Sequence, residues 1–377
     1  MSDTQTPLRN RLDSMEGIEL NEVRPSDNKL ALSLAAGGVG LAVALRLGLG
    51  LGTALSAIIA FLVFLVAVYV GYRKIGGPRV GSDQLIRALV YGAFVLALLP
   101  LLSLLWTVVS NGAGLAFNPD FLLNSTKGVT GVDDKKTVLE GAPLVGGAYH
   151  AIVGTLIITA IAAIISVPIG LFTAIYLVEY GAKNRLSHAI RFFVDVMTGI
   201  PSIVAGLFAF ALFAVLFGIG TKNGMAGGVA LSVLMIPTVV RNSEEMLRIV
   251  PNELREASLA LGVPKWLTIA KVVLPTAASG LASGITLAIA RVIGETAPLL
   301  VAVGYARAIN FDAFHGPMNS LAVFTYYMFT KPLSPGYRDP SIERAWAAAL
   351  LLVVVVILLN LLARLVAKIF APKTSGR

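Results

Sequence analysis

Cysteine is absent from this 377-residue sequence, and charged residues are scarce. Without cysteine the chain has neither disulfides nor thiolate metal sites, which excludes a disulfide-stabilised secreted module. Charged residues make up only 14% of the chain, whereas a soluble globular domain carries about 25%. Hydrophobic residues make up 56%. So few charges cannot cover a water-facing surface, and the composition therefore excludes a soluble enzyme and a disordered chain.

The sequence also lacks recognisable catalytic and nucleotide-binding motifs. No G-x-x-x-x-G-K-[ST] pattern occurs, and the glycine-rich stretch 218–224 is only a turn. His150, His188 and His315 are scattered and form no metal-ligating pattern. We therefore expect no catalytic residue, no metal, no cofactor and no ATP hydrolysis in the chain itself.

Long apolar segments predict an all-α polytopic membrane protein. The first candidate span is the weakest, because it is rich in glycine and carries Arg46. Residues 1–29 are polar and of mixed charge, unlike a cleavable signal, and we interpret them as a cytoplasmic tail. The candidate spans, eight in number, are 30–50, 53–72, 88–109, 149–178, 196–219, 224–240, 276–303 and 345–367.

Lysine and arginine are distributed unevenly between the loops. With the N-terminus inside, the inner loops and both terminal segments hold 20 basic residues, and the outer loops hold eight. This bias follows the positive-inside rule and predicts cytoplasmic N- and C-termini. The number of spans must then be even, so residues 30–72 cross twice or not at all. The net charge of +9 is thus a topology signal, and we expect no nucleic-acid partner.

Two outer connections, residues 110–148 and 304–344, are long. Long loops in a compact protein are usually functional or disordered. We consider two interpretations of these outer segments: a docking face for an extracytoplasmic partner, or a simple cover.

The inner loop, residues 241–275, is the most informative stretch. Asn252 follows a proline and can cap a short helix over 252–261. Gly262 then ends that helix, and Pro264 can begin the next one. The pattern predicts a compact two-helix knob that fits a groove on a soluble partner.

The knob also resembles the EAA motif of ABC importer permeases, written EAA, three residues, Gly, nine residues, I-x-L-P. This chain departs at two positions, with Ser258 in place of Ala and Val272 in place of Ile. The resemblance implies that the knob couples the chain to an ATPase. The residues concerned are Glu256, Ala257, Ser258, Gly262, Trp266 and Pro275.

The resemblance extends over residues 149–370, which are similar to the PstA family, the permease subunits of phosphate-specific ABC importers. It implies a six-helix type I permease core at 88–370, with residues 30–87 as an additional N-terminal hairpin and basic inner loop. It also implies the bacterial cytoplasmic membrane, with its lipid around the chain, and three partners: a second homologous permease, an ATP-binding cassette ATPase dimer that binds ATP and Mg²⁺, and an external phosphate-binding protein. The stretches that carry it are 170–184, 199–208, 236–247, 250–266 and 287–300.

Two charged residues lie inside the apolar segment 276–303. Arg291 and Glu295 are four residues apart, which places both on one face of a continuous helix. An arginine at the membrane centre costs about 2.5–3.5 kcal/mol, so such residues face the bundle interior and find partners. One interpretation is an ion pair that locks helix packing. The other is an anion site in which Arg291 binds phosphate and Glu295 holds the guanidinium when the site is empty.

Other residues extend this hypothetical substrate pathway. Broken helices near the midplane often build substrate sites, although glycine and proline are also frequent in membrane helices generally. The hydroxyls of Thr198, Ser202 and Thr296 could donate hydrogen bonds or satisfy their own backbone. Arg241 either receives the anion or anchors its helix at lipid head groups. The predicted helix breaks are Pro168, Pro201, Pro237 and Pro298.

We interpret the chain as a permease subunit of an ATP-driven phosphate importer that forms half of the translocation pathway. Two alternatives stay open on the sequence: a permease for another oxyanion such as molybdate or sulfate, and a non-transporting membrane scaffold in phosphate sensing.

Overall fold

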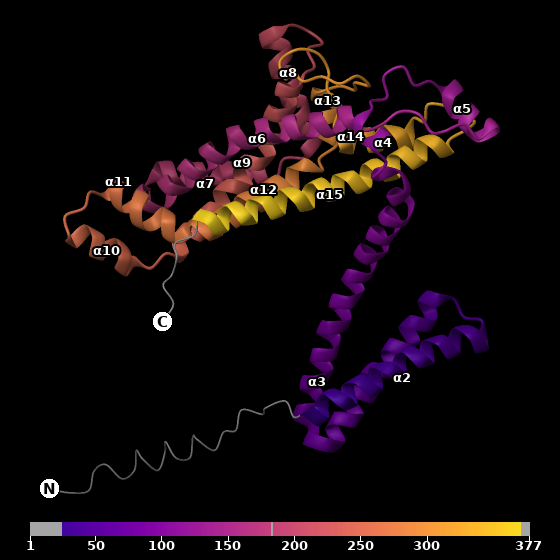
Figure 1. The fold of residues 1–377 in the computed structure, drawn as a ribbon. Helices are drawn as coiled ribbons and strands as arrows, with labels where there is room; N and C mark the ends of the chain where they lie inside the picture. The colour runs from indigo at the N-terminus through magenta and orange to yellow at the C-terminus, as the bar shows by residue number, and fades with distance from the viewer. Residues whose placement is uncertain (1–24, 182–183, 371–377) are drawn as a thin grey trace, which may run out of the picture. The chain divides into compact units, whose positions relative to one another are not determined.

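The computed structural model describes residues 25–181 and 184–370. The tail predicted at 1–29 lies mostly outside these ranges, and the first described helix, α2, begins at Pro25. Throughout the described ranges the regular structure is helical (Figure 1). The chain divides into two compact units, residues 1–104 and 105–377.

The first unit contains α2 (Pro25–Leu49) and most of α3 (Thr53–Ala116). The predicted spans 53–72 and 88–109 lie in the two helices that make up α3, which meet at a kink at Gly77, where φ is 84°. The residues expected to form a loop between the two spans are helical on both sides of this kink. Arginine and lysine are good helix formers, so the basic residues around the bend continue the helix. Phe61 and Gly92 touch within the unit, so the two arms of α3 pack together.

Six helices in the described ranges are long and apolar enough to cross a membrane, or seven if one bent pair counts as a span. The count is lower than the eight segments predicted, chiefly because α3, two helices that meet at a kink, is counted as one.

The second unit is built around α9 (Gly224–Ile249), which packs against α6, α8 and α12. A Cβ atom at Gly228 would lie 2.3 Å from Cγ2 of Ile161, so glycine is what lets α6 approach α9 closely. The elements of this unit, besides α9, are α4 (Pro119–Leu123), α5 (Gly131–Glu140), α6 (Tyr149–Ile175), the π-helical turn η1 (Tyr176–Tyr180), α7 (Arg185–Thr198), α8 (Ser202–Phe217), α10 (Asn252–Ala260), α11 (Lys265–Thr268), the π-helical turn η2 (Ile269–Val273), α12 (Leu274–Ile293), α13 (Ala297–Ala302), α14 (Leu321–Thr330) and α15 (Asp339–Phe370).

Two of the predicted spans are interrupted. The span predicted at 196–219 is a pair, α7 and α8, bent by 106° at a short break that contains Pro201. The span predicted at 276–303 ends as α12 at Ile293 and resumes as α13, with Pro298 in the first turn.

The helix breaks predicted at Pro168 and Pro237 are absent. These prolines lie inside α6 and α9, which continue through them. A proline removes one backbone hydrogen bond, and closely packed neighbours let a membrane helix tolerate that loss.

Candidate functional site

A hollow of about 230 Å³ lies where the two interrupted spans meet α9. The break between α7 and α8 supplies one wall, the middle of α9 a second, and the end of α12 a third. The lining residues are Met197, Thr198, Ile200, Ser202, Leu234, Pro237, Thr238, Arg291 and Glu295.

The packing of α8 on α13 holds the two breaks together. A Cβ atom at Gly206 would lie 2.5 Å from Cα of Pro298, so these helices touch backbone to backbone. Glycine at 206 and the buried proline at 298 therefore set the distance between the walls of the hollow.

Arg291 and Glu295 both line the hollow, but the helical spacing predicted for them is wrong. Helix α12 ends at Ile293, so Glu295 lies in the link to α13. Within the described residues, no hydrogen bond or ion pair joins the two side chains. The ion pair that would lock helix packing is therefore not formed, and Arg291 is an exposed residue that lines the hollow.

Ser202 is the first residue of α8 and brings the N-terminus of that helix to the hollow. The first backbone N–H groups of a helix have no intrahelical acceptor, and this end carries partial positive charge. Together with Arg291, it gives the hollow two features that favour an anion.

The other residues predicted for the pathway either do not line the hollow or have their hydroxyl proton engaged elsewhere. The hydroxyl of Thr198 donates to the Val194 carbonyl at 2.9 Å, so its proton is already engaged. Thr296 and Arg241 are not among the lining residues. Arg241 instead forms an exposed ion pair with Asp195 of α7.

The inner loop folds as a tail of α9 followed by α10, α11 and η2. Gly262 adopts φ of 78°. The N–H of Gly262 donates to the backbone carbonyl of Leu259 at 2.9 Å, and the N–H of Val263 donates to that of Ser258 at 3.3 Å. This pair of hydrogen bonds is the Schellman motif that ends a helix. The cap predicted at Asn252 is wrong, since Pro251 occupies the cap position.

The residues of the EAA-like motif separate into exposed and buried sets. Glu256, Ala257 and Gly262 are exposed, and so is Trp266, whose surface is 64% accessible. Leu261 is 84% exposed beside them. Ser258 is buried and shares a 2.9 Å hydrogen bond with Thr268, while Pro275 is half-buried in the first turn of α12. The exposed residues of the knob thus include apolar and acidic side chains, while the buried Ser258 and Thr268 join its two helices.

The sequence reasoning missed an ion pair behind this knob. Arg255 of α10 pairs with Glu179 of η1 at 3.0 Å. These residues are 76 positions apart, so no local spacing could have indicated the contact.

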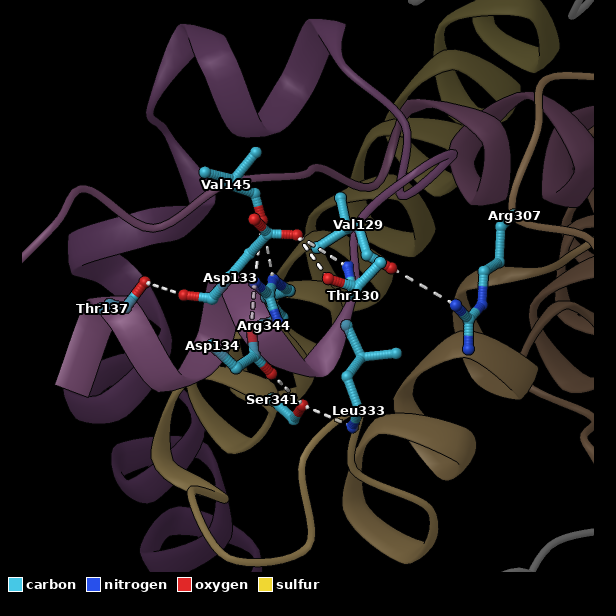
Figure 2. A network of polar contacts seen from close by, with 10 residues as sticks. All are labelled: Val129, Thr130, Asp133, Asp134, Thr137, Val145, Arg307, Leu333, Ser341 and Arg344. Carbon is cyan, nitrogen blue, oxygen red and sulfur yellow. Dashed lines mark hydrogen bonds and ion pairs between the residues drawn. The ribbon is translucent and has the colours of Figure 1, made fainter. Parts of the chain in front are cut away.

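A second missed pair joins the two outer segments (Figure 2). Arg344 of α15 binds Asp134 of α5 at 2.7 Å, and neither side chain is exposed. Ser341 donates to the other oxygen of Asp134 at 3.0 Å, and Arg344 donates to the Val145 carbonyl at 2.8 Å. Buried polar contacts therefore bind segment 110–148 to α15.

Comparison with known proteins adds independent findings. Residues 166–376 match the family model described as binding-protein-dependent transport system inner membrane component. The phosphate transport system permease protein PstA 1 of Mycobacterium tuberculosis is 47% identical over 276 residues, covering 73% of this chain and 85% of that protein. PstA of Mycobacterium leprae is 44% identical over 286 residues, covering 76% and 88%. The solved inward-facing MetNI methionine ABC transporter is 22% identical, with a TM-score of 0.46 over 60% of this chain and 95% of the matched chain.

Proposed function

Because the chain belongs to the family of binding-protein-dependent transport system inner membrane components, and within it to the PstA phosphate transport permeases, we propose that phosphate crosses this subunit through the hollow around Arg291. The protein is a membrane transport subunit, not an enzyme. A component of this family works with an ATPase and a binding protein.

The observation that carries the proposal is the meeting of Arg291 with the N-terminus of α8 at two helix breaks. A guanidinium matches phosphate oxygens with a planar fork of donors. Glu295 lines the same hollow, and its carboxylate repels a bound anion. The attraction of Arg291 and the repulsion of Glu295 together favour brief binding of phosphate. A transporter needs this, because a tightly bound anion would leave slowly.

The inner loop is the proposed contact with the ATPase. Its exposed Leu261 and Trp266 give an apolar surface, and Glu256 adds a charge beside them. In this mechanism the ATPase dimer binds ATP and Mg²⁺ and moves the knob, while this chain holds no cofactor. A second, homologous permease completes the pathway, and an external phosphate-binding protein delivers the anion to the outer segments.

For the topology we propose eight crossings with both termini in the cytoplasm. The two helices of α3, before and after the kink at Gly77, are each long enough to cross a hydrocarbon core about 30 Å thick. If the chain turns at Gly77 and crosses once with each helix, the basic residues around the turn lie inside, as the positive-inside rule requires.

The test is phosphate uptake by the full complex in proteoliposomes with Arg291→Ala. Losing a charged hydrogen bond to the passing anion is expected to lower uptake at least about tenfold. The complex should still assemble, as judged by co-purification of the ATPase. Arg248 is an exposed arginine outside the hollow, so Arg248→Ala is the matched control. The complex that carries it should transport phosphate normally.

Parent-level uptake in an intact Arg291→Ala complex would remove the hollow from the pathway. Sulfate and molybdate, added as competitors to the parent complex, separate phosphate transport from transport of another oxyanion. A parent complex that assembles but moves no anion would indicate a scaffold instead.

A further inference from the structure

The mostly buried ion pair between the inner loop and η1, the turn that follows α6, has no role in the pathway described so far. The side chains of Arg255 and Glu179 are 15% and 7% exposed. Arg255 also donates to the carbonyls of Val250 at 2.6 Å and Leu247 at 2.8 Å. One side chain thereby ties α10, the end of α9 and η1 together.

Glu179 is held by both helices of the knob. Its carboxylate accepts a hydrogen bond from Arg255 of α10. Its backbone carbonyl accepts one from the ammonium of Lys265, the first residue of α11. The same ammonium lies 4.8 Å from the ring centre of Tyr180. A displacement of either α10 or α11 therefore pulls on the same short stretch of chain.

That stretch is a π-helical turn, and such turns are frequent at functional sites. It continues directly from α6, which packs along α9, and α9 lines the hollow. The covalent chain already links the knob to α9 and α12. The contact through Glu179 adds a third connection, to a helix that the inner loop does not join in sequence.

We propose that Glu179 is a positioning residue that carries movement of the inner loop to α6, so that α6 follows the knob when the ATPase moves it. The inference rests on the proposed function and deepens it. Without the carboxylate, the knob still docks on the ATPase and moves α9 and α12, but α6 lags and the pathway opens incompletely. Such a complex hydrolyses ATP without moving its cargo.

The test measures phosphate uptake and ATP hydrolysis in the same proteoliposomes. Glu179→Gln keeps the size of the side chain and removes its charge. We expect the phosphate moved per ATP hydrolysed to fall about tenfold, with the ATPase still co-purifying. Glu179→Asp, which keeps a carboxylate, should recover part of the ratio. Arg248→Gln, which removes an exposed ion pair at the same end of α9, is the control and should keep the parent ratio.

An unchanged ratio in an intact Glu179→Gln complex would overturn the proposal. Loss of the ATPase from that complex would overturn it too, because the residue would then serve docking. If the parent complex transports another anion, the proposed phosphate specificity fails, but the ratio measured with that anion still tests Glu179.

Discussion

Arg344 and Asp134 form their ion pair without contact with water. Removing two charges from water is expensive, and the attraction repays it only when the remaining polar atoms are satisfied. Ser341 and the Val145 carbonyl supply such bonds, although Nη1 of Arg344 has no hydrogen-bond partner among the described residues. The loss of one more hydrogen bond or of either charge would therefore leave a buried charge without compensation.

Asp134→Asn should destabilise the protein by about 3–5 kcal/mol, because it leaves Arg344 buried without a counter-charge. Thermal unfolding of the purified subunit in detergent measures this.

Asp133→Asn is the neighbouring control. Asp133 accepts hydrogen bonds from the backbone N–H and hydroxyl of Thr130, which lower the pKa of its carboxyl, but unlike Asp134 it is only half-buried. Its substitution should have a much smaller effect. Equal losses for the two variants would contradict the importance of the buried pair.

At this scale the sequence predicted which residues lie near one another better than it predicted the individual contacts of each side chain. Arg291, Glu295 and Ser202 were expected near the pathway, and all three line one hollow. The partners of Arg344 and Arg255 were not foreseen, since 210 and 76 positions separate them from Asp134 and Glu179. Only folding brings such residues together.

The two interrupted spans are the elements that shape the hollow, and Gly206 sets how closely they pack. Gly206→Val should push α8 away from Pro298 and widen the gap between the breaks. Overpacking of this kind costs about 1–3 kcal/mol, and we expect phosphate uptake to fall several-fold. Uptake and thermal unfolding should be measured on the same preparations.

Gly294→Ala provides the matched comparison for Gly206→Val. A Cβ atom at Gly294 would meet nothing within 4 Å, although this glycine lies in the other break. The complex with Gly294→Ala should transport phosphate normally. A Gly206→Val variant that transports as well as Gly294→Ala would show that the spacing of α8 and α13 does not govern the pathway.

Apolar runs predicted where the long helices are, but not always where they break. Pro201 and Pro298 lie at breaks, whereas α6 and α9 continue through Pro168 and Pro237. A proline marks a weak point, and the packing around it decides whether the helix continues there. The helical stretch between 72 and 88 was missed because its charges suggested a loop, yet arginine and lysine form helices readily.

For the whole molecule, the proposed eight crossings can be tested by labelling, because the chain contains no cysteine of its own. We expect a membrane-impermeant maleimide added from outside to label Gly52→Cys and Lys135→Cys in intact cells. Lys74→Cys and Arg79→Cys should react only after the membrane is opened. Failure of Gly52→Cys to react from outside, with Lys135→Cys labelled, would show that residues 30–72 do not cross.

The second unit is held by ion pairs of two different kinds. Water reaches the pairs near the inner end of α9, Arg241 with Asp195 and Arg248 with Glu244, but not the pair between Arg344 and Asp134. Dissolved salt weakens ion pairs that water reaches and acts much less on buried ones, and the screening length falls from about 8 Å at physiological ionic strength to about 3 Å at 1 M salt. Raising the salt concentration thus weakens the contact of α9 with α7 through Arg241 and Asp195, and the pair within α9, but leaves α5 bound to α15. The salt in the extraction buffer therefore decides which end of this unit is held more firmly.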